Sequence, residues 1–184
     1  DGHTGYAPVP GTQGLREIVA AHHQTQAQVP TSAENVLITP GAQAALFAAH
    51  LAACDPHDKA LYIDPYYTTY PGMLRALSLN PVAIAAKASD GFQPNGASLN
   101  AAAQGAASLL INSPNNPTGV VYGQETLEII ADTCREHDLW LISDEVYASQ
   151  VWSGRHITPR SLPGMKDRSL IVGSMSKSHA MTGS

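Results

Sequence analysis

The stretch Ser108-Leu-Leu-Ile-Asn112 and the loop that follows it, Ser113-Pro-Asn-Asn-Pro-Thr-Gly119, decide how this chain folds. The first is a continuous apolar run of strand length, which is typical of a strand buried on both faces of a parallel sheet. The second is stiffened by two prolines and a glycine and carries more amide side chains than a turn needs. A buried strand that ends in a rigid polar loop predicts a ligand site at the end of that strand.

Similar apolar runs recur along the chain and alternate with segments of helical period. Strands are predicted at Asn35–Thr39, Ala60–Asp64, Pro81–Ala86, Ser108–Asn112, Leu139–Ser143 and Ser169–Gly173. Helices are predicted at Gly14–Gln26, Ala42–Ala53, Tyr70–Ser78 and Gln124–Glu136. The alanine-rich stretch around residues 101–103 is expected to form a surface helix or a turn. This alternation predicts an α/β fold, a mainly parallel sheet with helices on both faces.

The composition excludes several classes of protein. The chain has 184 residues, of which 43% are hydrophobic and only 14% charged, so it can bury a sizeable core and is not disordered. Its net charge is −5 and its basic residues are scattered, so we expect neither nucleic-acid binding nor a membrane-surface patch. No apolar run is long enough to span a bilayer. Two cysteines fit a reducing compartment, and a cytoplasmic location is expected.

The two ends of the sequence suggest a fragment. The chain begins at Asp1 rather than at methionine, and it stops at Ser184 inside a stretch rich in glycine, serine and lysine. Residues 1–6 carry neither the basic region nor the apolar region of a signal peptide.

In open α/β sheets, ligands bind beyond the carboxyl ends of the strands. The turn Thr39–Gln43 leads into a predicted helix, and a helix N-terminus can seat a phosphate, although every strand–turn–helix unit offers one. Three tyrosines within residues 66–70 can stack on a planar ring, or simply pack the helix on the sheet. Asp144 ends a buried strand and needs a partner, either a cationic ligand nitrogen, a structural salt bridge or a helix N-terminus.

Lys177 closely follows the predicted buried strand Ser169–Gly173, whereas Lys59, Lys87 and Lys166 lie in polar surroundings. In a partly desolvated pocket a lysine has a lowered pKa and becomes an amine nucleophile; otherwise it is a surface lysine in a frayed terminus. A phosphate seat, a stacking ring, an amide, an acid and a nucleophilic lysine follow five different predicted strands. Together they describe a site for pyridoxal 5′-phosphate (PLP), held as a Schiff base.

Three motifs resemble the signatures of the class I/II aminotransferases, which are fold-type I PLP enzymes. They are Ser113-Pro-Asn-Asn-Pro-Thr-Gly119, Ser143-Asp-Glu-Val-Tyr147 and Ser174-Met-Ser-Lys-Ser-His-Ala-Met-Thr-Gly183. The resemblance covers nearly the whole chain, with the motifs in the family's order and spacing. It implies that residues 1–184 are an incomplete large PLP-binding domain of a homodimeric transaminase, which moves an amino group from an L-amino acid to a 2-oxo acid. We expect the 184-residue chain alone to be inactive.

The resemblance also implies a role for individual residues. Lys177 would form the Schiff base and move the substrate proton, and Asp144 would pair with the pyridinium N–H. Asn116 and Tyr147 would bind the ring's 3′-oxygen, and Tyr67 would stack on the ring. The phosphate would be held by Ser174, Ser176 and the backbone N–H groups of Ala42 and Gln43. Tyr6 would reach the phosphate of the neighbouring subunit, so that the site is shared across a dimer.

Two departures from the family pattern accompany this resemblance. Relatives commonly have a second glycine and then serine, threonine or lysine where this chain has Ala42 and Gln43, so only backbone donation is expected there. The phosphate-binding arginine expected next after Ser184 lies outside the sequence, as does a small domain with a carboxylate-binding arginine.

Other functions share some of these motifs. The same motifs would serve a PLP-dependent C–S β-lyase or an enzyme like aminocyclopropane-carboxylate synthase. An aminotransferase-like sensor domain of a transcription regulator is a further alternative, which would need a DNA-binding domain upstream. No metal is expected, because Cys54/His57 and Cys134/His137 have Cys-x-x-His spacing but no further ligands that join them.

Overall fold

The computed structural model describes residue 2 and residues 5–183. Its five strands are β1 (Lys59–Asp64), β2 (Asn80–Ala85), β3 (Ala106–Asn112), β4 (Trp140–Asp144) and β5 (Ser169–Val172). Its α-helices are α1 (Gln13–Ala27), α2 (Ala42–Ala53), α3 (Tyr70–Ala76), α4 (Gly96–Ala103), α5 (Gln124–Glu136) and α6 (Met175–Ser178). Three short 3₁₀ helices are η1 (Ala33–Asn35), η2 (Ala88–Asp90) and η3 (Pro159–Ser161).

The strands form one sheet in the order β2-β1-β3-β4-β5, and all four pairings are parallel. From β1 the chain moves outward to β2 and then returns to β3 on the other side of β1. The direction of winding therefore reverses between β1 and β3. In open α/β sheets this reversal, at the carboxyl ends of the strands, is where ligands bind. Asp64 and Asn112 end β1 and β3 at this point.

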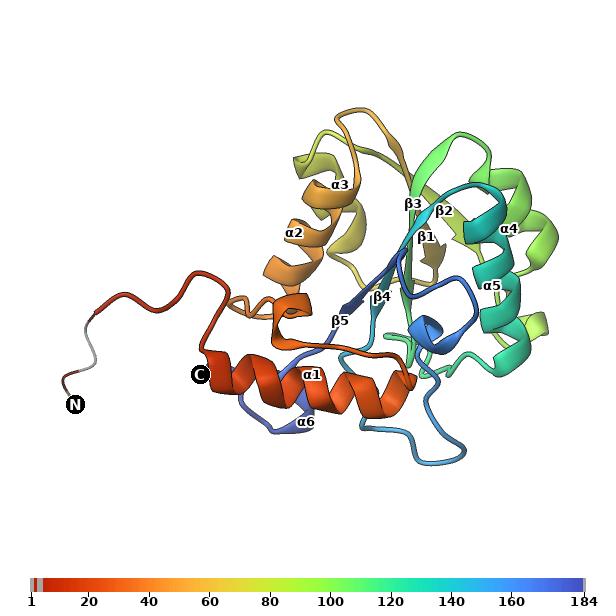
Figure 1. Ribbon diagram of the computed structural model, residues 1–184. Helices are drawn as coiled ribbons and strands as arrows, with labels where there is room; N and C mark the ends of the chain where they lie inside the picture. The colour runs from red at the N-terminus through yellow and green to blue at the C-terminus, as the bar shows by residue number, and fades with distance from the viewer. Residues whose placement is uncertain (1, 3–4, 184) are drawn as a thin grey trace.

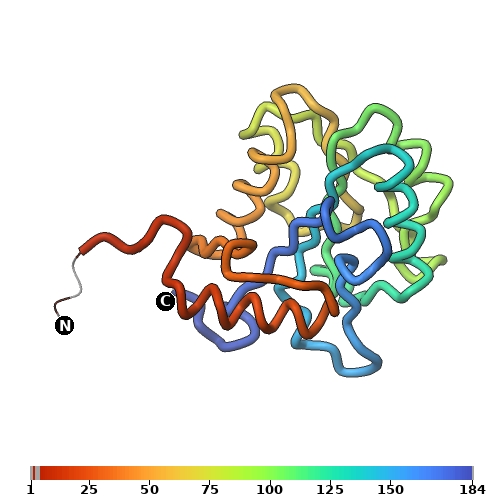
Figure 2. The backbone as a smooth tube through the Cα atoms, in the orientation of Figure 1, coloured from red at the N-terminus to blue at the C-terminus, as the bar shows by residue number. Residues whose placement is uncertain are grey.

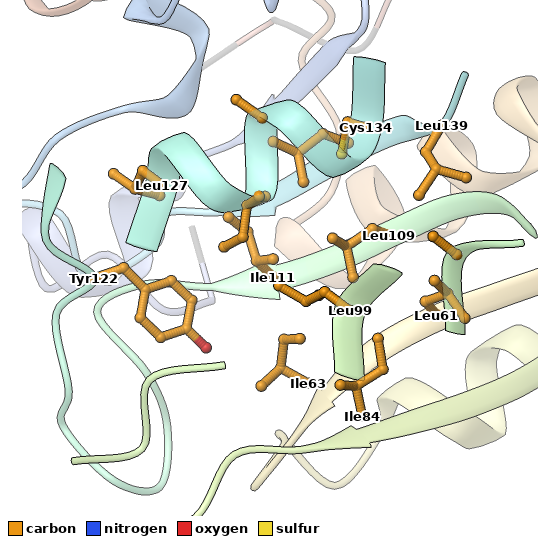
Figure 3. Close-up of a cluster of buried hydrophobic side chains, with 14 of the residues drawn as sticks. Leu61, Ile63, Ile84, Leu99, Leu109, Ile111, Tyr122, Leu127, Cys134 and Leu139 are labelled. Carbon is orange, nitrogen blue, oxygen red and sulfur yellow. The ribbon is translucent and has the colours of Figure 1, made fainter. Parts of the chain in front are cut away.

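Alternation along each strand sends side chains into two separate cores, one on each face of the sheet. Leu61 and Ile63 of β1 pack on α4 and α5, in the cluster that Figure 3 shows. Ala60 and Tyr62 point the other way and join residues of α2 and α3. Figure 1 shows these two helix pairs on opposite sides of the sheet. The prediction of a parallel sheet with helices on both faces is confirmed.

Helix α5 shows why the prediction from periodicity succeeded. Leu127, Ile130, Ala131 and Cys134 form one buried stripe along it, as helical spacing requires. The stretch around residues 101–103 is also helical, as α4, but it is not merely a surface element. Leu99 has no exposed surface and contributes to the core beside α5.

The strand predicted at Asn35–Thr39 is wrong. Asn35 ends η1, and the residues after it are extended but pair with no strand of the sheet. The Ile38 N–H instead donates to the carbonyl oxygen of Pro10, 3.0 Å away. Leu37, in the middle of the run, is 57% exposed, so this apolar run is too short and too open for a central strand.

The described stretch from residue 5 to residue 9 projects away from the rest of the molecule (Figures 1 and 2), and Tyr6 is fully exposed on it. None of the helices in the described residues combines the length and the apolar character needed to cross a membrane.

His50 on α2 is a buried polar group with a measurable consequence. Its side chain has no exposed surface, and its Nδ1 lies 2.8 Å from the Leu46 carbonyl oxygen, which makes Nδ1 the protonated nitrogen. Its Nε2 is buried without a hydrogen-bond partner in the part of the chain that the structure describes. Burial lowers the pKa of His50 below 6.5, against the effect of the Leu46 bond.

We therefore expect stability to fall in acid through His50. Below the ordinary histidine pKa of 6.5, His50 is protonated in the unfolded chain but stays neutral in the folded chain. The free energy of unfolding therefore decreases as the pH drops through 6.5. The slope from this one group reaches at most about 1.4 kcal/mol per pH unit. Urea unfolding across this range should show a shallower pH dependence in His50→Leu and an unchanged one in a His22→Leu control on the exposed side of α1. Identical slopes for wild type and His50→Leu would refute this account.

Candidate active site

The sheet brings the polar ends of its strands together. β1, β3, β4 and β5 are consecutive neighbours, and Asn112 is in register with Asp144, which in turn is in register with Val172. The predicted segments that follow β1, β3, β4 and β5 therefore leave the same edge of the sheet, whereas Thr39–Gln43 follows none of the described strands. Each prediction can be compared with where these side chains lie.

Asp144 is the most deeply buried of the predicted site residues. It is 5% exposed, and Oδ2 accepts a hydrogen bond from the hydroxyl of Tyr70 at 2.7 Å. Oδ1 accepts from the backbone N–H of Val146 at 3.3 Å. Burial raises the pKa of Asp144, and the bonds from Tyr70 and Val146 oppose that rise. No lysine, arginine or histidine within residues 5–183 forms a salt bridge with it.

These contacts leave one of the three partners predicted for Asp144, the cationic ligand nitrogen. A structural salt bridge is absent from the described residues, and the residues after Asp144 form turns rather than a helix that it would cap. A buried carboxylate without a cation is costly, and a cationic ligand group would offset that cost. The geometry thus fits a ligand that carries a positively charged nitrogen.

The asparagines at the end of β3 and in the loop after it have two different roles. Asn112 and Asn115 hold the loop through hydrogen bonds, whereas the Asn116 side chain is left without a partner among the described residues. Asn112 donates from Nδ2 to the Asp144 carbonyl oxygen at 3.0 Å and accepts at Oδ1 from the Asn116 N–H at 2.7 Å. Asn115 accepts from the N–H and the hydroxyl of Thr118, and it donates to the Pro65 carbonyl oxygen. The side chain of Asn116 makes no hydrogen bond to any described residue, so it is free to bind a ligand.

Asn116 and Tyr147 line one hollow of about 560 Å³ at this edge of the sheet. Lys177 approaches the same tyrosine, with Nζ 5.7 Å from the centroid of the Tyr147 ring. Gln150 donates to the Lys177 carbonyl oxygen at 3.3 Å, which joins the loop after β4 to α6. Asn116 thus shares this hollow with Tyr147, and Lys177 lies near the ring of the same tyrosine without lining the hollow.

The desolvated pocket expected around Lys177 is not present. Lys177 is exposed on α6, a single helical turn that none of the described elements covers. Its proximity to Tyr147 is therefore the geometric support for its role.

The three tyrosines between β1 and α3 have different environments. Tyr66 packs edge-on against Tyr62, with ring centroids 4.9 Å apart. Tyr70 points into the protein, toward Asp144. Tyr67 is 40% exposed and contacts Tyr70 edge-on at 5.9 Å, so it is the ring of the three that can stack on a ligand.

Two short segments carry the residues predicted to hold a phosphate. Ala42 and Gln43 are the first residues of α2, where backbone N–H groups have no partner within the helix. The turn that leads in needs Gly41, whose φ of +86° favours glycine. The side chain of Gln43 is engaged elsewhere, because its Oε1 accepts from Thr69. Ser174 caps α6, with Oγ accepting from the Ser176 N–H at 3.1 Å.

Tyr6 is not brought to this site within the chain. Tyr6 is fully exposed, so its predicted contact with the phosphate of a neighbouring subunit stays a prediction.

Sequence reasoning missed the residues that hold the site. Tyr70 and Asn112 hold Asp144 through hydrogen bonds. The sequence pattern shows Tyr70 only as one of three clustered tyrosines, and Asn112 only as the end of a predicted strand before a polar loop. Glu145 is 4% exposed and accepts from Ser143 and Thr158, while its Oε2 lies 2.7 Å from Nε2 of His156. The available signal was strand alternation, which turns neighbouring acids to opposite faces.

Comparisons with known proteins show the family to which the chain belongs. The sequence model of the family described as aminotransferase class I and II matches residues 1–184. The arginine–pyruvate transaminase AruH of Pseudomonas aeruginosa is 38% identical over 183 residues, which are 99% of this chain and 47% of the relative. The aspartate/prephenate aminotransferase of Thermus thermophilus is 36% identical, with 99% and 47% covered. The chain thus spans about half the length of the curated relatives it matches.

Solved structures give the same picture. The aspartate aminotransferase from Thermus thermophilus with maleate matches with a TM-score of 0.93 at 35% identity, over 98% of this chain and 47% of that one. The aromatic aminotransferase from Pyrococcus horikoshii OT3 matches with a TM-score of 0.94 at 33% identity, over 98% and 49%. The sheet with its two helical layers is therefore the fold of the PLP-dependent aspartate aminotransferases, and the chain belongs to the class I and II aminotransferase family.

Proposed function

We propose that this chain is the cofactor-binding part of a PLP-dependent aminotransferase that transfers an amino group from an L-amino acid to a 2-oxo acid. The observation that carries the proposal is the buried Asp144 carboxylate, which has no cationic partner among the described residues and lies at the sheet edge. Family membership supports the same conclusion. When bound, PLP supplies an electron-withdrawing ring that stabilises negative charge at the substrate α-carbon.

The residues present fit that cofactor. Asp144 matches a protonated ring nitrogen in charge, and Asn116 and Tyr147 offer donors for a ring oxygen. Tyr67 offers an exposed ring face for stacking. The first turn of α2 at Ala42 and Gln43, together with Ser174 and Ser176, offers donors for a phosphate. Each of these roles remains part of the proposal.

Lys177 would hold the cofactor covalently and then act on protons. Its Nζ is a primary amine, which can condense with an aldehyde and, once released, can accept and return the proton of the substrate α-carbon. Tyr147, beneath that amine at 5.7 Å, would orient it by a cation–π contact.

The partners of the whole protein follow as further proposals. We infer a homodimer in which Tyr6 of one subunit reaches the phosphate of the other, because the exposed N-terminal segment projects away from its own domain. Its substrates would be small amino and oxo acids. The two free cysteines, Cys54 and Cys134, support a reducing compartment such as the cytoplasm.

The test of the function uses the full-length protein that carries this chain. Borohydride reduction in the presence of PLP should fix the cofactor on Lys177, detected by the mass of the modified peptide. Lys177→Ala should abolish the adduct and transamination, whereas Lys166→Ala, at an exposed lysine outside the site, should retain both. A reduced adduct that persists in Lys177→Ala would show that the attachment point is another lysine.

Asn112→Ala tests how the site is held. The change leaves the Asn116 N–H without its acceptor, and an unmade bond of this kind costs about 1–3 kcal/mol. It also removes one of the two hydrogen bonds to the Asp144 carbonyl oxygen, which keeps the bond from the Ser113 N–H at 3.2 Å. We expect the free energy of unfolding to fall by about 2 kcal/mol and PLP affinity to fall by about tenfold or more. Urea unfolding and PLP titration measure the two effects.

The matched control for Asn112→Ala is Asn80→Ala. Asn80 donates to the His57 carbonyl oxygen in an exposed bond at the start of β2, away from the site. Its loss should change the free energy of unfolding by less than about 1 kcal/mol and leave PLP affinity unchanged. Equal effects of the two substitutions would remove the special role of Asn112.

A further inference from the structure

We propose that Tyr70 is a positioning residue for the cofactor site, which holds the Asp144 carboxylate ionised and oriented through a neutral hydrogen bond. The inference rests on the proposed function of Asp144. It concerns a residue that makes no contact of its own with the hollow beside Asn116 and Tyr147.

Packing fixes the Tyr70 hydroxyl in place. Tyr70 begins α3, is 1% exposed, and belongs to the buried cluster that includes Met73, Leu74 and Leu46. Pro71 follows it at a position where proline suits a helix start. The phenol therefore cannot swing to solvent, and its 2.7 Å bond to Oδ2 of Asp144 is part of the folded core.

The two bonds to the Asp144 side chain are unequal. The Tyr70 bond is 2.7 Å long, a normal length for an O–H donor, whereas the Val146 N–H lies at 3.3 Å, near the limit for a hydrogen bond. The Asp144 carbonyl oxygen is held separately, by the Asn112 side chain and the Ser113 N–H. Tyr70 is thus the principal group that sets the orientation of the carboxylate.

A neutral donor is suited to this position. A lysine or arginine here would neutralise Asp144 and compete with a cationic ligand nitrogen, whereas a phenol stabilises the carboxylate and leaves its charge unpaired. Burial, and then the nearby Asp144 charge, raise the pKa of Tyr70 far above its ordinary value. The shared proton therefore stays on the phenol, and the same bond works against the burial that raises the pKa of Asp144.

The experiment measures PLP affinity against pH in the full-length protein. A Lys177→Ala background makes binding reversible, and quenching of tryptophan fluorescence by added PLP reports the affinity between about pH 5 and pH 9. Tyr70→Phe keeps the buried ring and removes the bond. We expect PLP affinity to fall below a certain acidic pH, the break, where Asp144 takes up a proton. Tyr70→Phe should move this break upward by about one pH unit, with a loss of affinity of about tenfold below the break and little change above it.

Two controls separate positioning from packing. Tyr122→Phe removes another phenol that is 1% exposed, in the cluster on the opposite face of the sheet, and should leave the break in place. In an Asp144→Asn background, Tyr70→Phe should add no further pH-dependent loss, because the carboxylate it acts on is gone.

The contrary outcomes are distinct. A uniform loss of affinity at every pH, an unmoved break, or an undiminished effect in the Asp144→Asn background would overturn the role of Tyr70 and leave the proposed function intact. Absence of PLP binding in the Lys177→Ala protein at every pH would overturn the proposed function and this inference together.

Discussion

Burial of the Asp144 carboxylate is the constraint on which the rest of the site depends. An acid at the end of a central strand is tolerated only if donors surround it, and those donors come from two directions. Tyr70 reaches its side chain from α3, and Asn112 reaches its main chain from the neighbouring strand. The tyrosine loop after β1 and the asparagine loop after β3 are thereby tied to one residue of β4.

The Asn112 contact also explains why the loop after β3 is so rich in amides. The side chains of Asn112 and Asn115 bind backbone groups of the loop. Asn116 therefore does not have to hold the loop, and its side chain can bind a ligand at the hollow. A rigid positioned donor in a loop requires other residues to satisfy the loop's own backbone. The sequence Ser-Pro-Asn-Asn-Pro-Thr-Gly contains both kinds of residue, and the sequence pattern alone does not distinguish them.

Prediction from the sequence succeeded where one physical rule dominated. Apolar runs identified β1 to β5, and helical spacing identified α5. Burial explains this for β1, β3 and β4 in the centre of the sheet and for the stripe of α5, whereas the edge strands β2 and β5 are less buried. It failed at residues 35–39, where strand formation depends on a pairing partner that the sequence does not reveal. It also did not separate Tyr67 from Tyr70, since the turn between them, which leads into α3, decides which ring is exposed and which meets the acid.

Asp144 and Glu145 are adjacent acids that are both buried, yet their surroundings share no side-chain donor. One is bonded to a phenol, and the other to a histidine and two hydroxyls. Since successive side chains of a strand point to opposite faces, a slip of β4 by one residue would turn Asp144 and the adjacent Glu145 each to the other face. The ladder of backbone bonds from β3 to β4 and from β4 to β5 therefore also fixes which of the two acids meets Tyr70 and which meets His156.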